Sequence, residues 1–248
     1  MKMKHILNFS SSLCFLLMFT LAQAQEKPAA TSNVEQVADS IPVKKDRYGL
    51  RVGVDLFKLT RGFYDKNYKG IELTGDFRWN KKYYLAAELG NENKTTEDDR
   101  LTTNSKGSYL KAGFDYNMYE NWLDMENIIS IGLRYGLSTF SQELNSYKIY
   151  NPNPYWGELP PIPATEQFNG LSASWIEVVT GMKAKMFNNV FVGFSVQLKT
   201  LVTNKKPEGF DNLYIPGFNR TYNGSFGIGF NYSVTYFVPL YKKKVIVK

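Results

Sequence analysis

The clearest pattern in the chain is an alternation of apolar and polar positions over 221–239. Every second residue from Tyr222 to Val238 is aromatic, aliphatic or glycine, and the residues between them, up to Thr235, are polar or glycine. A repeat of two predicts a β-strand with a different environment on each face. The repeat is about twice the roughly 5–6 residues of an average soluble strand, whereas a tilted transmembrane strand needs about 9–11 residues. We therefore interpret this segment as the last strand of an outer-membrane barrel.

Seven further segments repeat the alternation earlier in the chain. They span 48–56, 70–79, 83–89, 108–119, 127–138, 172–186 and 190–202. The links after the first, third, fifth and seventh segments are long, and the other links are short. Outer-membrane barrels combine an even number of strands with short periplasmic turns and long outer loops. The sequence therefore predicts an all-β fold, a single-domain antiparallel up-and-down transmembrane β-barrel of about eight strands.

The links themselves carry two further expectations. The long links are 60–69, 91–107, 139–171 and 203–220, and the short links are 80–82, 120–126 and 187–189. Aromatic residues near the short links are expected to form an interfacial girdle. They are Tyr48, Trp79, Tyr83, Trp122, Tyr236 and Phe237.

Residues 1–24 have the features of a signal peptide. Lys2 and Lys4 precede an apolar stretch, and Ala22-Gln23-Ala24 forms a small-residue cleavage site. The only cysteine, Cys14, lies in the apolar stretch. A cleaved signal peptide implies an exported protein.

Three regions are expected after the signal peptide. Residues 25–46 are rich in Ala, Ser, Thr, Pro and charged residues, which favours a flexible periplasmic leader. The outer-membrane barrel is expected over 47–239. Residues 240–248 contain four lysines and are expected to form a basic tail.

Composition limits the chemistry of the processed chain. The only histidine, His5, and the only cysteine both belong to the signal peptide. Without them the chain has no disulfide, no thiol nucleophile, no zinc site of Cys or His, and no Ser-His-Asp triad. We therefore predict a protein that is not an enzyme and that uses no metal or other cofactor.

Net charge adds little to this assignment. The chain has a formal net charge of +7, and loss of Lys2 and Lys4 leaves 28 basic against 23 acidic residues, or +5. No phosphate-binding loop and no nucleic-acid-binding motif accompanies this charge. We expect no nucleic acid among the partners.

Charged residues dominate the polar face of the predicted strands. The candidate network inside the barrel consists of Arg51, Asp55, Glu72, Asp76, Arg78, Glu88, Lys111, Asp115, Arg134, Glu177, Lys183, Lys185 and Lys199. An eight-stranded barrel is just wide enough for its side chains to fill it, and buried charges must be paired. We expect a plug of cross-strand ion pairs, with a narrow path for a solute or protons as the alternative.

Aromatic residues in the two longest links are the candidate contacts to a partner. They are Tyr147, Tyr150, Tyr155, Trp156, Phe210, Tyr214 and Phe218. Aromatic side chains on proline-stiffened loops suit a ligand or a partner protein. The alternative is that these rings pack on one another and cover the mouth of the barrel.

Three segments carry a resemblance to a known family. They are DRYGLRVGVD at 46–55, AAELGN at 86–91 and DNLYIPGFNR at 211–220. Together with the signal peptide they resemble a Gram-negative outer-membrane β-barrel family with no assigned function. The resemblance implies a barrel in the cell outer membrane, and it brings no catalytic motif.

These observations favour a non-enzymatic outer-membrane β-barrel. Its role is expected to be structural, or binding through the outer loops or the periplasmic ends. Its expected partners are outer-membrane lipid and an envelope protein. Two alternatives stay open: a narrow solute pore, and a soluble periplasmic ligand-binding barrel whose apolar face would point inward.

Overall fold

A computed structural model of the protein describes residues 43–120, 125–150, 152, 155, 157, 159–209, 211–220 and 224–246. The expected signal peptide and the leader up to residue 42 lie outside these residues. The elements are β1 (Val43–Asp55), α2 (Leu56–Tyr64), β2 (Tyr68–Arg78), β3 (Tyr83–Asp98), β4 (Leu101–Asn117), β5 (Ile128–Tyr147), β6 (Ile162–Phe187), β7 (Val190–Asn204) and β8 (Phe226–Ile246).

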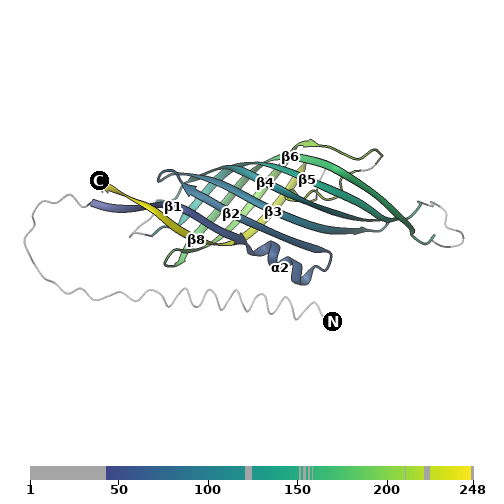
Figure 1. Ribbon diagram of the computed structural model, residues 1–248, viewed down its shortest axis with the longest axis horizontal. Coiled ribbons are helices and arrows are strands. Elements are labelled where there is room, and N and C mark those ends of the chain that lie inside the picture. Colours follow the sequence, from purple (N-terminus) through teal and green to yellow (C-terminus); the bar gives the residue numbers. More distant parts are fainter. Residues whose placement is uncertain are drawn as a thin grey trace, which may run out of the picture. The chain divides into compact units, whose positions relative to one another are not determined.

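The eight strands form one closed antiparallel barrel (Figure 1). Each strand pairs with the next in sequence, and β8 closes the ring by pairing with β1 over Val43–Asp55. The predicted all-β, up-and-down barrel of eight strands is therefore confirmed. We call the end with the links 79–82, 118–127 and 188–189 the short-turn end, and the opposite end the hairpin end.

The two faces of the wall have opposite polarity. On β5, every second residue from Ile129 to Leu137 is an exposed apolar side chain, and the residues between them, Arg134 included, are buried. The same exposed apolar side chains recur on all eight strands. The alternation in the sequence thus separates an apolar outer belt from a polar interior.

The strands extend further towards the hairpin end than the sequence predicts. The expected loop 91–107 is wrong, because β3 and β4 stay paired up to Asp98↔Leu101 across a two-residue turn. Part of the expected loop 139–171 also belongs to β5 and β6. On β3 and β4 both faces are polar outside the apolar belt, so the alternation disappears, although the backbone hydrogen bonds continue.

A helix replaces the polar link expected over 60–69. The Asp55 carboxylate ends β1 and caps α2 by accepting a hydrogen bond from the Phe57 amide at 2.7 Å. β8 continues beyond the end of β1, and α2 packs on it through Phe57 and Phe230, whose ring centroids are 4.4 Å apart. The Thr60 hydroxyl also lies 2.7 Å from that of Tyr232. α2 therefore lines the wall beside β2 and β8 where β1 has ended.

The barrel is also longer than expected at the short-turn end. Residues 43–46, assigned to the leader, belong to β1, and residues 240–246, assigned to the basic tail, belong to β8. Both boundaries are corrected, because the two strands supply each other's hydrogen-bond partners as far as Val43↔Ile246. This pairing does not depend on apolar side chains.

The expected girdle divides between the two faces. Trp79, Tyr83 and Tyr236 are exposed, whereas Tyr48 and Phe237 are buried. Phe237 is inward-facing because it continues the alternation of the buried Ser233 and Thr235. Tyr48 lies at a shift in the register between β1 and β8, where Leu240 of β8 is the extra residue of a bulge. Trp122 lies outside the described residues.

The hydrophobic core lies at the hairpin end of the interior. Its buried members are Tyr109, Phe140, Leu171, Ala173, Trp175, Ile215 and Phe218. Two of them come from the link between β7 and β8, which folds back into the barrel. We call residues 211–220 the plug loop. Among the described residues, no helix is both long and apolar enough to cross a membrane.

Candidate functional site

The candidate site is the charged interior together with the plug loop. Nearest the short-turn end, Arg51 and Lys183 each approach the Asp76 carboxylate to 2.5 Å. The Arg51 guanidinium also lies over the rings of Tyr84 and Phe191, at 4.7 and 5.4 Å from their centroids. Two cations therefore share one carboxylate, and aromatic rings cover the guanidinium of Arg51.

A second cluster lies at the short-turn mouth. Glu126, in the link between β4 and β5, pairs with Arg47 of β1 and, at 2.9 Å, with Lys185 of β6. Burial raises the pKa of Glu126, but the hydrogen bonds from Arg47 and Lys185 outweigh this and hold the pKa below its usual range. Through Glu126, this cluster connects β1 with β6, two strands that are not neighbours in the barrel.

The middle layer is built on the ion pair between Arg134 and Asp115. Arg134 Nη2 donates to both carboxylate oxygens of Asp115 at 2.8 Å. Its Nε lies 3.7 Å from Glu88, and Lys111 Nζ lies 2.8 Å from the other oxygen of the same carboxylate. These buried charges form one connected network across β3, β4 and β5.

Lys111 connects the middle layer to the upper layer. Besides Glu88, its ammonium lies 3.4 Å from Glu72 and 3.7 Å from Glu177. Glu177 in turn lies 3.4 Å from Lys199 and accepts a hydrogen bond from the Trp175 indole at 2.7 Å. A single ammonium therefore has three carboxylates from three strands around it.

Lys58 enters the interior from α2. Its ammonium lies 2.8 Å from Glu72 and 2.6 Å from Glu92. It also donates to the hydroxyl of Tyr109, which donates to Glu72 at 2.5 Å. The helix thus supplies a cation to the part of the interior that lies beyond the end of β1, towards the hairpin end.

Glu92 also holds the plug loop. Its carboxylate accepts hydrogen bonds from the Gly217 amide at 3.0 Å and from the Tyr214 hydroxyl at 2.7 Å. Lys199 donates to the Gly217 carbonyl at 2.8 Å. Gly217 has a φ of +82°, and an added Cβ would lie 2.5 Å from the Tyr109 ring, so this position requires glycine.

Apolar packing completes the seat of the plug loop. Ile215 and Phe218 are completely buried. The Phe218 ring meets that of Trp175 edge-on, with centroids 5.8 Å apart. Trp175 also covers Gly136, where an added Cβ would lie 2.3 Å from the indole. The hairpin end of the interior is therefore filled by side chains.

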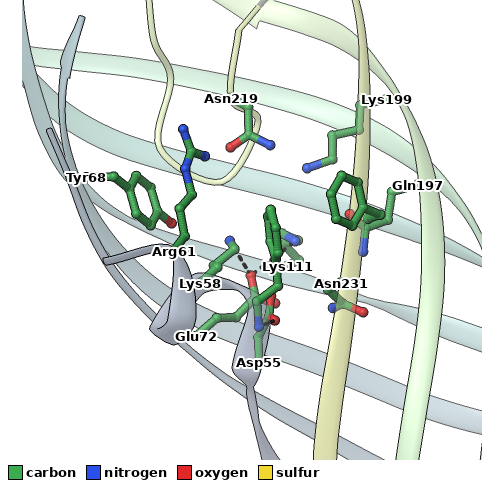
Figure 2. A pocket seen from close by; sticks show the side chains of 12 residues that line it. Asp55, Lys58, Arg61, Tyr68, Glu72, Lys111, Gln197, Lys199, Asn219 and Asn231 are labelled. Atoms are coloured by element: carbon green, nitrogen blue, oxygen red, sulfur yellow. Dashed lines mark hydrogen bonds and ion pairs between the residues drawn. The ribbon is translucent and has the colours of Figure 1, made fainter. Parts of the chain in front are cut away.

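A small cavity remains between the plug loop and the charges. It measures about 20 Å³, room for about one water molecule. Figure 2 shows Lys58 and Lys199 directed into the space between Asn219 of the plug loop and the carboxylates of Asp55 and Glu72. One carboxylate oxygen of Asp55 and one of Glu72 have no hydrogen-bond partner among the described residues. The interior is polar and nearly full.

The structure brings the thirteen residues of the expected charge network to the inner face of the barrel or to its short-turn mouth. Buried members are Arg51, Asp55, Glu72, Asp76, Glu88, Lys111, Asp115, Arg134, Glu177 and Lys199. Arg78, Lys183 and Lys185 are half-buried at the short-turn end. Cross-strand ion pairs join most of the network.

Two of the expected loop contacts require correction. Tyr214 and Phe218 are buried, since Tyr214 donates to Glu92 and Phe218 packs on Trp175. Burial removes them from the surface that a partner could reach. The remaining described candidates are exposed at the hairpin end: Tyr147, Tyr150 and Tyr155. Trp156 and Phe210 lie outside the described residues.

Several charged residues of the site were not predicted from the sequence, among them Arg47 and Glu126 at the short-turn mouth and Lys58 and Glu92 in the upper layer. Glu92 continues the spacing of two from Glu88, a signal that the expected loop concealed. Lys58 lies in a helix, and no alternation marks it as inward-facing. Among the described residues, no group of three His, Cys, Asp or Glu is placed to hold a metal ion.

The molecule is thus an eight-stranded β-barrel with a charged, plugged interior and an apolar exterior. Residues 6–243 match the family described as Domain of unknown function (DUF6048), and the chain belongs to this family. No curated protein matches the chain. A solved structure similar to it is that of Ail, the attachment invasion locus protein of Yersinia pestis. The two are 11% identical, with a TM-score of 0.40, over 77% of this chain and 97% of that chain.

Proposed function

We propose that the protein is a non-enzymatic outer-membrane β-barrel with a structural or binding role in the cell envelope. One observation carries the proposal: the exterior of the wall is apolar and the interior is charged. On β5 the belt from Ile129 to Leu137 covers about 27 Å of strand, or roughly 20 Å of height at a tilt of about 40°. This is close to the apolar band of about 25 Å in outer-membrane barrels.

The same observation argues against a soluble ligand-binding barrel. Such a barrel would bury its apolar face and expose its polar face. Here Leu133 and Phe194 are more than two-fifths exposed, while Glu177 is completely buried. An apolar exterior on every strand exceeds the few hundred Å² of patch that soluble monomers expose.

The exposed aromatic residues at the hairpin end support binding to an envelope protein. Tyr150 is 63% exposed and lies under the Arg100 guanidinium, 4.1 Å from its ring centroid. Tyr155 is 86% exposed. Exposed tyrosines beside arginine are frequent in protein interfaces.

The first test is heat-modifiability combined with membrane fractionation. We expect the protein in the sarkosyl-insoluble outer membrane, and a shift in gel mobility on boiling, because a closed barrel stays folded in detergent until heated. Leu133→Arg places a charge in the middle of the belt, which is expected to disfavour the inserted barrel by about 2–4 kcal/mol and reduce the shifted band. The matched control is Leu159→Arg, an exposed residue outside the strands. A periplasmic protein without a shift would contradict the proposal.

A second test concerns conduction. Because ion pairs and the plug loop fill the interior, we expect no steady single-channel steps from the purified protein in planar bilayers. Reproducible steps that persist in protein purified to homogeneity would support a solute pore instead. Lys199→Met, which removes the hydrogen bond to the Gly217 carbonyl, tests whether the plug loop controls any conductance.

A further inference from the structure

β1 and β8 continue past the short-turn end as a two-stranded ribbon (Figure 1). We call Lys44–Arg47 of β1 and Lys242–Lys244 of β8 the basic ribbon. Its register pairs Lys45 with Lys244 and Arg47 with Lys242. These seven positions hold six basic residues and one acidic residue, a net charge of +5. So many like charges on paired strands repel one another, which favours a partner of opposite charge.

The barrel neutralises only part of the charge of the basic ribbon, because Arg47 pairs with Glu126. Asp46, its single acid, lies 3.8 Å from Arg78 of β2 and 3.4 Å from Lys81 of the following link, so it already has two cations beside it. Lys242 and Lys243 are exposed, and neither forms an ion pair with a described residue. The Lys243 ammonium lies 5.0 Å from the centroid of the Tyr48 ring. Positive charge therefore faces outward from the ribbon.

The ribbon begins where the apolar belt ends. Leu240 is the last belt residue of β8 and is 61% exposed. Lys242 follows two residues later, about 7 Å along the strand, and the polar layer on each side of a bilayer is about 5–8 Å thick. The stacked rings of Tyr48 and Tyr241, with centroids 5.4 Å apart, mark the boundary between them. Lys242 and Lys243 are thus at the depth of lipid headgroups.

We propose that the basic ribbon binds anionic phospholipid headgroups of the leaflet at the short-turn end. The proposal rests on the proposed function, since it requires the belt to lie in the membrane. Lysine ammonium groups donate strong hydrogen bonds to phosphate oxygens, and each adds electrostatic attraction to an anionic surface. The ribbon would hold the barrel at a defined depth through this leaflet.

The test compares lipid affinities for the full chain purified from cells and reconstituted in phosphatidylcholine vesicles. Brominated phosphatidylglycerol and brominated phosphatidylcholine are titrated separately, and quenching of tryptophan fluorescence is measured. Trp79 is 62% exposed at the short-turn end and reports on this leaflet. Each lysine near an anionic lipid surface raises the binding constant roughly fivefold. We therefore expect phosphatidylglycerol to bind several-fold more strongly than phosphatidylcholine.

Matched variants localise the effect. Lys242→Gln/Lys243→Gln is expected to bring the ratio of the two affinities close to one, and 0.5 M salt is expected to do the same for the unaltered protein. Lys66→Gln/Lys106→Gln removes the same charge at the hairpin end and is expected to leave the ratio unchanged. Equal quenching by both lipids in the inserted protein, or equal effects of both variant pairs, would overturn the proposal.

Insertion is measured separately in the same samples by the mobility shift on boiling. Absence of both the shift and quenching would contradict membrane insertion itself. A normal shift with no preference for phosphatidylglycerol would contradict only the lipid site. The two failures are therefore distinguishable.

Discussion

Replacing Lys111 by methionine is expected to destabilise the folded barrel by about 3–5 kcal/mol. The Lys111 ammonium is the shared partner of Glu88, Glu72 and Glu177, all of them nearly or completely buried. Methionine fills a similar volume but leaves three carboxylates facing one another without their common cation. Removal of one partner from a buried ionic network is costly because the remaining charges stay desolvated.

The measurement is urea unfolding in detergent or vesicles, followed by the loss of the fast-migrating folded band. Lys106→Met changes an exposed lysine on the same strand and is expected to alter stability by no more than about 0.5 kcal/mol. Adding Glu88→Gln to Lys111→Met is expected to recover part of the loss, since Glu88 is the nearest of the three carboxylates. A Lys111→Met barrel as stable as the unaltered protein would contradict a tightly coupled charged interior.

Replacing Phe218 by alanine is expected to release the plug loop. Truncation of a completely buried phenylalanine costs about 3–5 kcal/mol, and here it also removes the edge-on contact with Trp175. The strands close the barrel without the loop, so the loss is expected mainly as local opening of residues 211–220. Trypsin cleavage after Arg220 is expected to accelerate by about two to four orders of magnitude, if cleavage follows the open population.

The readout is the rate of trypsin cleavage at low protease concentration, with the mobility shift on boiling as a check of the barrel. Phe226→Ala, which truncates a side chain 63% exposed on the outer face, is the matched control and is expected to leave the rate nearly unchanged. Equal cleavage rates for Phe218→Ala and the unaltered protein would show that Glu92 and Lys199 hold the loop without the aromatic contact.

Much of the wall could be predicted because the strands carry an apolar outer face and a polar inner face. On β5 the alternation of Ile129, Leu133 and Leu137 with Arg134 identifies both the strand and its orientation. Beyond the belt that signal ends: Thr96 and Thr103 pair across β3 and β4, yet nothing in their pattern distinguishes a strand from a loop. Backbone pairing continues there independently of side-chain polarity.

The residues of the candidate site that lie on these alternating strands could be predicted from the sequence. Arg51, Glu72 and Lys111 are found by their position between apolar neighbours. Lys58 is not, because the orientation of α2 follows from the end of β1 at Asp55 and from the packing of Phe57 on β8. Partners 14 to 122 residues apart, such as Lys58 with Glu72 or Tyr214 with Glu92, meet only through the closed ring of strands.

The number of strands, their up-and-down order and the charged face of each can be predicted from the amino-acid sequence alone. These are local properties, since a repeat of two records the environment of each residue. The folded barrel was needed to show that residues 211–220 turn inward, that Tyr214 and Phe218 are buried, and that Lys44 to Arg47 pair with β8 as a basic ribbon. Aromatic residues are found both at surfaces and in interiors, and basic residues are buried only where acidic groups pair with them. Their placement therefore depends on which distant groups close around them.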